Sequence, residues 1–431
     1  MENTQYIVAL EIGSSKIVGA IAEKSPSGYV QVIHLEEERL SNYVRYGSIV
    51  NVENVKGSVM RILKKLENSI DGSINDVYVG ISGRSIHSIL SEVNRNLDPS
   101  QQITAEILDK IIRDAGRDPI KNYETIDIVP REYEVDRKTL EDPVGGYGNS
   151  INIKVNLIVA RPIIKTNLTR ALTNITHVKG YLITPLVVAE EILDESELRL
   201  GVMLVDIGAE TTTVSIYQDN KLHYLTTLPL GGRNITLDIA NGLRTVEESA
   251  ERVKKNINNP LSEKVESMNI DGVNSAEAAN YIKARTGEIV ANITKQLEYA
   301  GVEPTDLKCI VLVGGGAQLQ GIDRELSERS KMRVRMGKAP KSLNILDHSI
   351  NRNEYIQIFS LLTRAAEIIP EGQSCLMRHN YEDGPSMPVI EDKPEEQPKV
   401  DEPEARKKKR KWWEKMKDTA SQFLGDESDE M

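Results

Sequence analysis

Residues 201–208 of the chain read Gly-Val-Met-Leu-Val-Asp-Ile-Gly, and residues 8–13 read Val-Ala-Leu-Glu-Ile-Gly. Each stretch is an apolar run that ends in an acidic residue, an isoleucine and a glycine, and a hairpin-like stretch follows each one. Short apolar runs before a glycine turn are typical of buried strands. Because the pattern occurs twice, we interpret the chain as a duplicated core.

Both turns are candidates for binding phosphate. A strand that ends in a Gly/Ser turn exposes backbone N–H groups, which suit an anion, although an ordinary hairpin turn is the alternative interpretation. The acidic residues at the two strand ends, Glu11 and Asp206, are candidates to hold Mg²⁺ through water. The candidate phosphate-binding residues are Gly13, Ser14, Ser15 and Lys16 in the first turn, and Gly208, Ala209, Glu210, Thr211 and Thr212 in the second.

A third glycine motif lies at residues 310–319, which read Ile-Val-Leu-Val-Gly-Gly-Gly-Ala-Gln-Leu. We expect a buried strand, three glycines and then a helix that includes residues 321–327. Glycines let a ligand lie close to the backbone, and three in succession are costly for a plain strand-to-helix turn. The sequence contains neither the G-x-G-x-x-G fingerprint nor a G-x-x-x-x-G-K-[ST] phosphate loop.

Composition excludes several classes of protein. The 431 residues allow two to four domains, and the net charge of −11 argues against a nucleic-acid binder. Two cysteines cannot form a disulfide framework or a four-cysteine metal site. No secretory signal opens the chain and no apolar run reaches 18 residues, so we expect a soluble cytoplasmic protein.

Strand-like and helix-like segments alternate over the first 380 residues, which indicates α/β layers. Residues 82–161 differ and are interpreted as a small α+β insert. Its expected elements are a helix at 105–115, strands at 125–135 and 153–160, and a glycine-rich loop at 143–149.

The end of the chain has a different composition. Residues 384–405 are rich in proline and charge and are expected to be a disordered linker. Six consecutive cations follow at 406–411, and then an amphipathic stretch. At 100° per residue, its apolar side chains fall within an arc of about 120°. The members of this arc are Trp412, Trp413, Met416, Ala420, Phe423 and Leu424.

The flanking cations Arg410, Lys411, Lys415 and Lys417 can reach anionic head groups, so we interpret residues 406–425 as an interfacial membrane helix. A single such helix should bind reversibly, and polymerisation of the folded part would add avidity. The alternatives are a calmodulin-type target, a nucleic-acid arm, a solubility tail, or a segment that packs back on the core.

Taken in order, the three glycine motifs resemble those of the actin/Hsp70/sugar-kinase superfamily. There, two hairpins hold the phosphates of ATP and the triple glycine holds the adenosine. Residues 250–254, Ala-Glu-Arg-Val-Lys, are similar to the superfamily's A-E-x-x-K, whose Glu and Lys approach the ribose and base. The resemblance implies ATP and Mg²⁺ as cofactors. It implies adenosine contacts from Glu251, Lys254, Gly314, Gly315, Gly316 and Gln318.

Within the superfamily, the chain resembles the FtsA family of bacterial cell-division proteins over nearly its whole length. The insert follows the strand at 77–83, and residues 185–190 and 231–240 look like the family's connecting helix and the helix after the second hairpin. The resemblance implies an actin-like, duplicated ribonuclease-H-like fold with an α+β insert, a disordered tail and a terminal amphipathic helix. The implied units are subdomain 1A (1–81 and 162–200), 1C (82–161), 2A (201–230 and 306–383), 2B (231–305), the linker (384–405) and the membrane-targeting helix (406–425).

The family resemblance also implies a function. The protein would polymerise at the cytoplasmic face of the inner membrane at the division site, tether FtsZ filaments there and recruit later division proteins. The FtsZ tail is expected on residues 231–305, and contacts to later division proteins and to polymer neighbours on the insert. Rival interpretations are a sugar kinase of the same superfamily and a PilM-like scaffold, which usually lacks the terminal helix.

The chain departs from the superfamily pattern at three places. Glu11 stands where most members have Asp, and Ala209-Glu210 stands where actins have Gly-Gly. Glu210 would either lie near the phosphates or point away from them. Thr184 falls where many members carry a Gln or Glu that orients the attacking water. We therefore expect ATP binding with slow or negligible hydrolysis.

Overall fold

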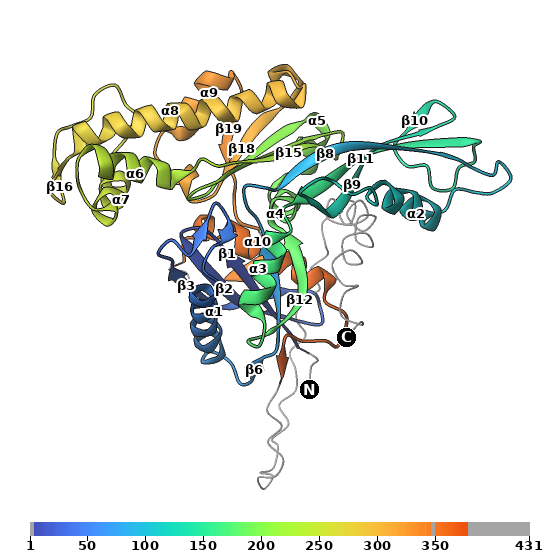
Figure 1. The fold of residues 1–431 in the computed structure, drawn as a ribbon, viewed down its shortest axis with the longest axis horizontal. Helices are drawn as coiled ribbons and strands as arrows, with labels where there is room; N and C mark the ends of the chain where they lie inside the picture. Colours follow the sequence, from blue (N-terminus) through green and yellow to red (C-terminus); the bar gives the residue numbers. More distant parts are fainter. Residues whose placement is uncertain (1–3, 341, 346–349, 378–431) are drawn as a thin grey trace, which may run out of the picture.

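The computed structural model describes residues 4–340, 342–345 and 350–377. The predicted linker at 384–405 and the predicted membrane helix at 406–425 lie outside these residues. Figure 1 shows a lower body that holds the first half of the duplication and an upper body with two arms. The helices of the second half form the left arm, and the insert forms the right arm.

The first half is built on a six-stranded sheet, in the order β12-β7-β1-β2-β3-β20. Helix α1 (Val52–Glu67) covers it and begins where the Asn51 side chain accepts a hydrogen bond from the Asn54 N–H. This side chain satisfies one of the free N–H groups of the first turn. The remaining helices of this half include α3 (Ile163–Leu172) and α10 (Ile356–Ile368). Residues 306–383 were predicted to belong to the second half, but β20 joins the first-half sheet and α10 packs in its core, so the predicted unit is wrong for these elements. The strands are β1 (Gln5–Ile12), β2 (Lys16–Lys24), β3 (Val30–Arg39), β7 (Asp76–Ile81), β12 (His177–Ile183) and β20 (Leu343–Ile345).

The second half is built on a five-stranded sheet, in the order β15-β14-β13-β18-β19. Its strands are β13 (Val202–Ile207), β14 (Thr212–Gln218), β15 (Lys221–Leu228), β18 (Cys309–Val313) and β19 (Val334–Met336). Its helices are α6 (Gly232–Gly242), α7 (Glu247–Asn256), α8 (Ser275–Ala300), the 3₁₀ turns η1 (Pro304–Asp306) and η2 (Gly316–Gln318), and α9 (Ile322–Ser330).

The two halves repeat one arrangement of strands. In each, the first strand pairs with the next strand antiparallel and with a later strand parallel: β1 with β2 and β7, and β13 with β14 and β18. The turns also match, because the Gly13 N–H donates to the Lys16 carbonyl at 3.0 Å and the Gly208 N–H to the Thr211 carbonyl at 2.8 Å. The predicted duplication is confirmed.

Strand β13 separates two hydrophobic cores. Val202 and Leu204 belong to the core that continues into the first half, whereas Met203, Val205 and Ile207 belong to the core beneath the helices of the second half. Alternate residues of a strand point to opposite faces, so this continuous apolar run is buried on both sides. Helices α4 (Thr184–Ile192) and α5 (Glu195–Leu200) lead from the first half into β13.

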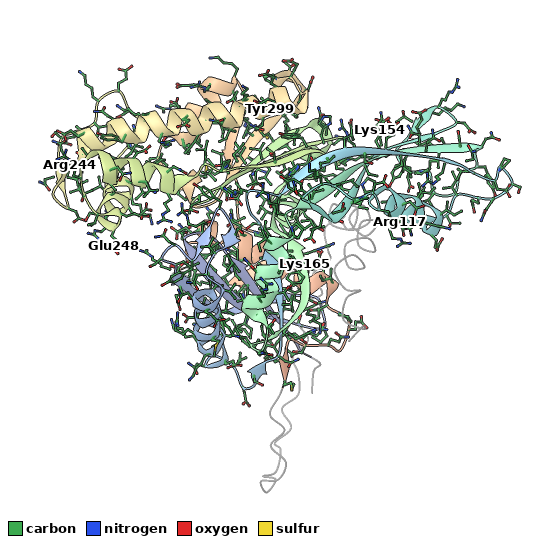
Figure 2. The ribbon with its side chains drawn as sticks, in the orientation of Figure 1. Arg117, Lys154, Lys165, Arg244, Glu248 and Tyr299 are labelled. Carbon is green, nitrogen blue, oxygen red and sulfur yellow. The ribbon has the colours of Figure 1, made fainter. Side chains whose placement is uncertain are left out.

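The insert is a four-stranded antiparallel sheet with one helix and a core of its own. It meets the second half at the edge strand β15, where the Leu225 N–H donates to Ser88 Oγ at 2.9 Å and Asn156 Nδ2 to the Leu222 carbonyl at 2.6 Å. Its elements are β8 (His87–Asn96), α2 (Ala105–Ala115), β9 (Glu124–Val135), β10 (Lys138–Leu140) and β11 (Ser150–Ala160). The predicted α+β insert is confirmed. Figure 2 shows Arg117 on this arm and Arg244 at the far end of the other.

Short elements complete the fold. They are β4 (Val44–Arg45), β5 (Ser48–Ile49), β6 (Ser73–Ile74), β16 (Asn269–Ile270), β17 (Val273–Asn274), η3 (Arg352–Glu354) and β21 (Leu376–Met377). Within the described part of the chain, no helix has both the length and the apolar character needed to cross a bilayer.

A candidate nucleotide cleft

The two predicted phosphate hairpins lie close together, although they belong to different halves. A loop of the first half, residues 44–47, contacts both of them. The Gly47 N–H donates to Ser14 Oγ of the first hairpin at 2.9 Å, and the Tyr46 N–H donates to Glu210 Oε2 of the second at 2.6 Å. Because these donors are on consecutive residues, the two turns face the same space.

Two carboxylates, Glu11 and Asp206, lie near the ends of the strands β1 and β13 that lead into these hairpins, and their charges interact. The pKa of Glu11 is raised from 4.5 to about 7, chiefly by burial and also by the neighbouring charge of Asp206, against an opposing effect of Lys16. Burial also raises the pKa of Asp206. Two carboxylates that disfavour each other's ionisation are favourable neighbours for a cation.

The donor set fits Mg²⁺ held with a nucleotide. Mg²⁺ is usually bound by one or two carboxylates together with waters and substrate phosphates, rather than by a cage of protein ligands. Among the residues that the structure describes, no group of three or more His, Cys, Asp or Glu could hold a metal alone. Glu11 and Asp206 would supply the protein's share of such a site.

Gln357 is a site residue that sequence reasoning missed. Its Nε2 donates to both oxygens of Asp206, at 3.0 and 2.9 Å, and this contact opposes the rise in the pKa of Asp206. Gln357 is near the start of α10, outside the three glycine motifs. The two residues are 151 positions apart, and no local pattern marks the contact.

The triple glycine follows β18 and packs on the second hairpin. A Cβ on Gly314, where φ is +93°, would lie 2.3 Å from Asp206 Oδ1, and a Cβ on Gly316 would lie 2.5 Å from Ile207 Cγ2. At Gly315, by contrast, no atom lies within 4 Å of a Cβ position. Two of the glycines therefore allow close packing, and the third borders open space. Gln318 is exposed beside it in η2.

Glu251 and Lys254 lie next to the triple glycine. Lys254 Nζ is 2.5 Å from Glu251 Oε2 and donates to the Gly232 carbonyl at 3.0 Å, and a Cβ on Gly232 would lie 3.4 Å from the Cα of Gly316. Burial lowers the pKa of Lys254. Burial alone would raise the pKa of Glu251, but Lys254, Thr236 and Lys255 together lower it below its usual value. The pair thus borders the space that Gly315 opens, and the Thr236 hydroxyl contacts both.

Lys16 and Thr212 make contacts inside the protein. The Lys16 ammonium is 2.7 Å from Glu37 Oε2 and 4.1 Å from the centre of the Tyr355 ring. The Thr212 hydroxyl donates to the Leu230 carbonyl at 2.8 Å. A phosphate contact from either side chain would require these partners to be given up.

Glu210 points toward the first half. Its Oε1 accepts hydrogen bonds from Arg45 Nε at 2.8 Å and Arg233 Nη1 at 2.9 Å, in addition to the contact of its Oε2 with Tyr46. The side chain is 3% exposed. These partners were not predicted, because Arg45 is 165 residues away along the chain.

Thr184 is the first residue of α4. It is the residue predicted to stand where many superfamily members carry a Gln or Glu that orients the attacking water. It is buried, and its Oγ1 has no hydrogen-bond partner. A Cβ on Gly80 of β7 would lie 2.7 Å from this oxygen. The hydroxyl is therefore confined against the sheet of the first half.

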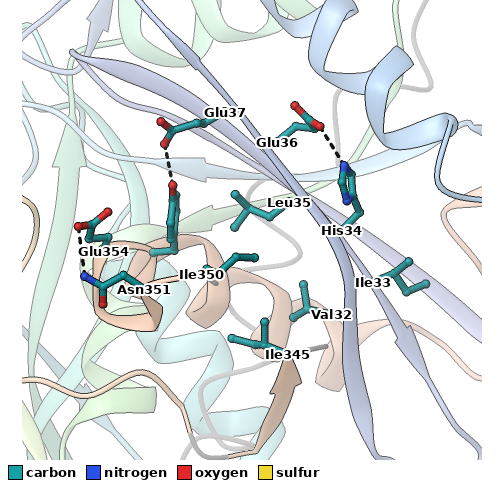
Figure 3. Close-up of a pocket in the computed structure, with 11 residues that line it drawn as sticks. Val32, Ile33, His34, Leu35, Glu36, Glu37, Ile345, Ile350, Asn351 and Glu354 are labelled. Carbon is teal, nitrogen blue, oxygen red and sulfur yellow. Dashed lines mark hydrogen bonds and ion pairs between the residues drawn. The ribbon is translucent and has the colours of Figure 1, made fainter. Parts of the chain in front are cut away.

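A separate hollow of about 420 Å³ lies between β3 and the segment around η3 (Figure 3). None of the predicted site residues lines it, although Glu37 and Tyr355, the partners of Lys16, form one wall. Residues 346–349, which connect two of its walls, lie outside the described part of the chain. We therefore assign it no ligand.

Sequence comparison finds close relatives over most of the chain. The family model "Cell division protein FtsA" matches residues 203–359, and the model "SHS2 domain inserted in FTSA" matches residues 83–159. The cell division protein FtsA of Porphyromonas gingivalis is 30% identical over 353 residues, which are 78% of this chain and 73% of that protein. The FtsA of Bacillus subtilis is 29% identical over 343 residues, which are 75% of this chain and 76% of that protein.

Comparison of structures supports the fold. A chain of the PilM-PilN type IV pilus biogenesis complex superposes with a TM-score of 0.60 at 16% identity, over 84% of this chain and 98% of that one. At this identity, the likeness shows the fold alone. The actin-like α/β fold with an inserted small domain, expected from the three glycine motifs, is confirmed.

Proposed function

Because the chain belongs to the FtsA family of cell-division proteins, we propose that it binds ATP in the cleft between its two halves and works as a membrane-attached, polymerising partner of FtsZ. The observation that carries the nucleotide proposal is the meeting of the two duplicated hairpins at one loop. Backbone N–H groups of both turns would then face one phosphate chain.

Different parts of the cleft would contact different parts of the nucleotide. Phosphates would lie at the turns 13–16 and 208–211, and Mg²⁺ would be held through water by Glu11 and Asp206. The adenosine would lie over Gly315, with Glu251 and Lys254 beside it. Support for this placement comes from the open space at Gly315, which a side chain would narrow.

Hydrolysis is proposed to be slow. Orienting an attacking water requires a polar group within hydrogen-bond reach of it. The Thr184 side chain is short, buried and confined against Gly80, and it offers no such group to the cleft. The Gln357 amide, which reaches the same site, already donates to both oxygens of Asp206.

The membrane proposal comes from the sequence of the tail. The arc of tryptophan and aliphatic residues and the flanking cations have the composition of a helix that lies in the interface of an anionic bilayer. The described chain runs as far as β21, which pairs with β6 of the first half. FtsZ binding on residues 231–305, recruitment of later division proteins and location at the division site follow from family membership as proposals.

Flotation with anionic liposomes tests the proposal. The full chain, a chain that ends at Asp383, and a full-length Trp412→Glu/Trp413→Glu variant would each be floated with and without ATP and Mg²⁺. We expect only the unaltered full chain to float, and ATP to strengthen its binding. Equal flotation of all three, or of none, would contradict the membrane proposal and favour a scaffold without a membrane anchor.

A sugar kinase of the same superfamily is the alternative enzyme. A coupled assay for ADP release in the presence of a panel of sugars separates the two. We expect a rate that no sugar increases, whereas a rate that depends on one sugar would replace the present proposal.

A further inference from the structure

Glu210 is the residue of the second hairpin that departs most from the superfamily pattern, and its side chain connects the two halves. We propose that Glu210 is a positioning residue that fastens the second phosphate hairpin to the first-half loop 44–47, and that this latch sets how fast nucleotide leaves the cleft. The inference rests on the proposed function, because it concerns release of the same nucleotide.

The first argument is the number and type of the contacts. One buried carboxylate accepts hydrogen bonds from two arginines and a backbone N–H, at 2.8, 2.9 and 2.6 Å. Two of the donors, Arg45 and Tyr46, belong to the first half. Hydrogen bonds between ionised partners are stronger than neutral ones, and a buried carboxylate that loses them is strongly disfavoured. Separation of the halves at this point is therefore costly.

The second argument is that both ends of the latch are held in place. On the second half, Arg233 also binds Glu247 through two contacts, at 2.5 and 2.9 Å. On the first half, the Tyr46 carbonyl accepts a hydrogen bond from the Arg84 N–H at 3.0 Å, and the Arg84 guanidinium lies 5.1 Å from the centre of the Tyr46 ring. A movement of Glu210 would therefore also have to displace or break contacts of residues in both halves.

The third argument is the place of the loop. The Gly47 N–H donates to Ser14 Oγ of the first hairpin, directly after the residue that binds Glu210. The loop therefore joins the two turns that would enclose the phosphates. The equivalent position in the first hairpin is Ser15, which is exposed and makes no comparable contact across the cleft. The latch is thus a feature of one hairpin and not of the duplicated turn.

The test measures release of a fluorescent ATP analogue, chased with excess ATP, from the full chain and from Glu210→Ala. We expect release to become roughly tenfold faster. Arg45→Ala removes one of the two first-half donors, and we expect a smaller increase because the Tyr46 N–H still binds Glu210. Because Arg45→Ala removes only a contact that Glu210→Ala also removes, the double variant should release nucleotide little faster than Glu210→Ala alone.

Glu38→Ala is the matched control. Glu38 accepts two hydrogen bonds from Arg61, at 2.9 and 2.6 Å, and both residues belong to the first half. The control loses a more exposed carboxylate–arginine pair that lies within the first half and does not contact Glu210 or the loop 44–47, so its release rate should equal that of the unaltered chain. Glu210→Gln keeps the shape of the side chain and replaces Glu210→Ala if the latter does not fold.

A second measurement needs no nucleotide. Hydrogen exchange of peptides covering residues 43–49 should become faster in Glu210→Ala and Arg45→Ala, and stay unchanged in Glu38→Ala. If the unaltered chain binds no ATP analogue, the proposed function fails, and the exchange result alone decides whether the contact holds the loop. Release rates within twofold of the unaltered chain, or unchanged exchange of this loop, would overturn the latch.

Discussion

The two halves of the molecule share the same strand pairing and differ where a ligand would lie. Ala9 pairs with Tyr78 in the first half as Leu204 pairs with Val311 in the second, so the end of β7 is equivalent to the end of β18. At this end, the first half has Ile81, which is 1% exposed, and the second half has Gly314 at the start of the triple glycine.

This difference shows how one duplicated frame acquires an asymmetric cleft. The first half closes its strand end with a buried side chain and continues into the insert. The second half has three glycines in succession, so the backbone approaches Asp206 and leaves open space at Gly315. Backbone geometry is common to both halves, and the side chains decide which half would receive the adenosine.

The largest expected effect comes from making the second half resemble the first. In Gly314→Ala, a methyl group would lie 2.3 Å from Asp206 Oδ1 at a φ of +93°. Strain and overpacking together should reduce the free energy of unfolding by about 2–4 kcal/mol. Urea denaturation measures this change. A loss below about 0.5 kcal/mol would mean that the cleft relaxes easily and that the comparison of the strand ends is wrong.

Gly315→Ala sharpens the same comparison one residue further along. Its methyl group would enter open space at an ordinary φ of −65°, so the free energy of unfolding should change by less than about 0.5 kcal/mol. Affinity for ATP should nevertheless fall roughly tenfold, because the methyl group narrows the space assigned to the adenosine. Calorimetric titration with ATP and Mg²⁺ measures this affinity. An unchanged affinity would show that the adenosine binds elsewhere.

Glu11 and Asp206 occupy equivalent positions in the two halves, and the titration of Glu11 should make the stability of the protein depend on pH. The pKa of Glu11 is raised from 4.5 to about 7 in the folded chain, so between these values the folded state binds more protons than the unfolded state. Stability should therefore fall as pH rises from about 4.5 to about 7, by at most about 3 kcal/mol for this group, and stay level above it.

Glu11→Gln removes this titration. Urea denaturation of both proteins between pH 5 and pH 7.5 should show that the advantage of the variant grows with pH over this window. Mg²⁺ with ATP should reduce the difference, since a cation between the carboxylates favours their ionised forms. A difference that does not change with pH would show that Glu11 titrates normally.

The smallest expected effect concerns Thr184, at the junction of the halves. Its hydroxyl is buried without a partner, so Thr184→Val should leave the free energy of unfolding unchanged or raise it by up to about 1 kcal/mol. The rate of ATP hydrolysis should stay within about twofold, because the hydroxyl orients nothing. A large loss of hydrolysis in this variant would give Thr184 a catalytic role and contradict the interpretation of slow turnover.

Local pattern was sufficient for the parts of the cleft that lie along one strand and its turn. Apolar runs that end in an acidic residue, isoleucine and glycine predicted both hairpins, and the triple glycine predicted an unusually close turn after a buried strand. Such features depend on residues that are neighbours in the chain. The duplicated fold and its insert followed from their order, and the structure and the family comparisons agree.

The contacts that connect the halves could not be predicted in this way. Gln357 reaches Asp206, and Arg45 and Tyr46 reach Glu210, across separations of 151 to 165 residues. The sequence left two orientations open for Glu210, and only the position of the loop 44–47 relative to the second hairpin decides between them. Which residues contact each other across two distant segments depends on how the two sheets pack. The hydrophobic periodicity of either segment does not contain this information.

The sequence by itself therefore determined the class of fold, the two turns, the glycines and the composition of the tail, because each depends on residues close together in the chain. The tertiary structure decided that Glu11 and Asp206 lie close enough to interact, that Gln357 binds Asp206, and that Glu210 contacts the first-half loop 44–47. Those facts depend on how the two halves are placed relative to each other. That placement is set by the packing of the cores around β13, α4 and α10.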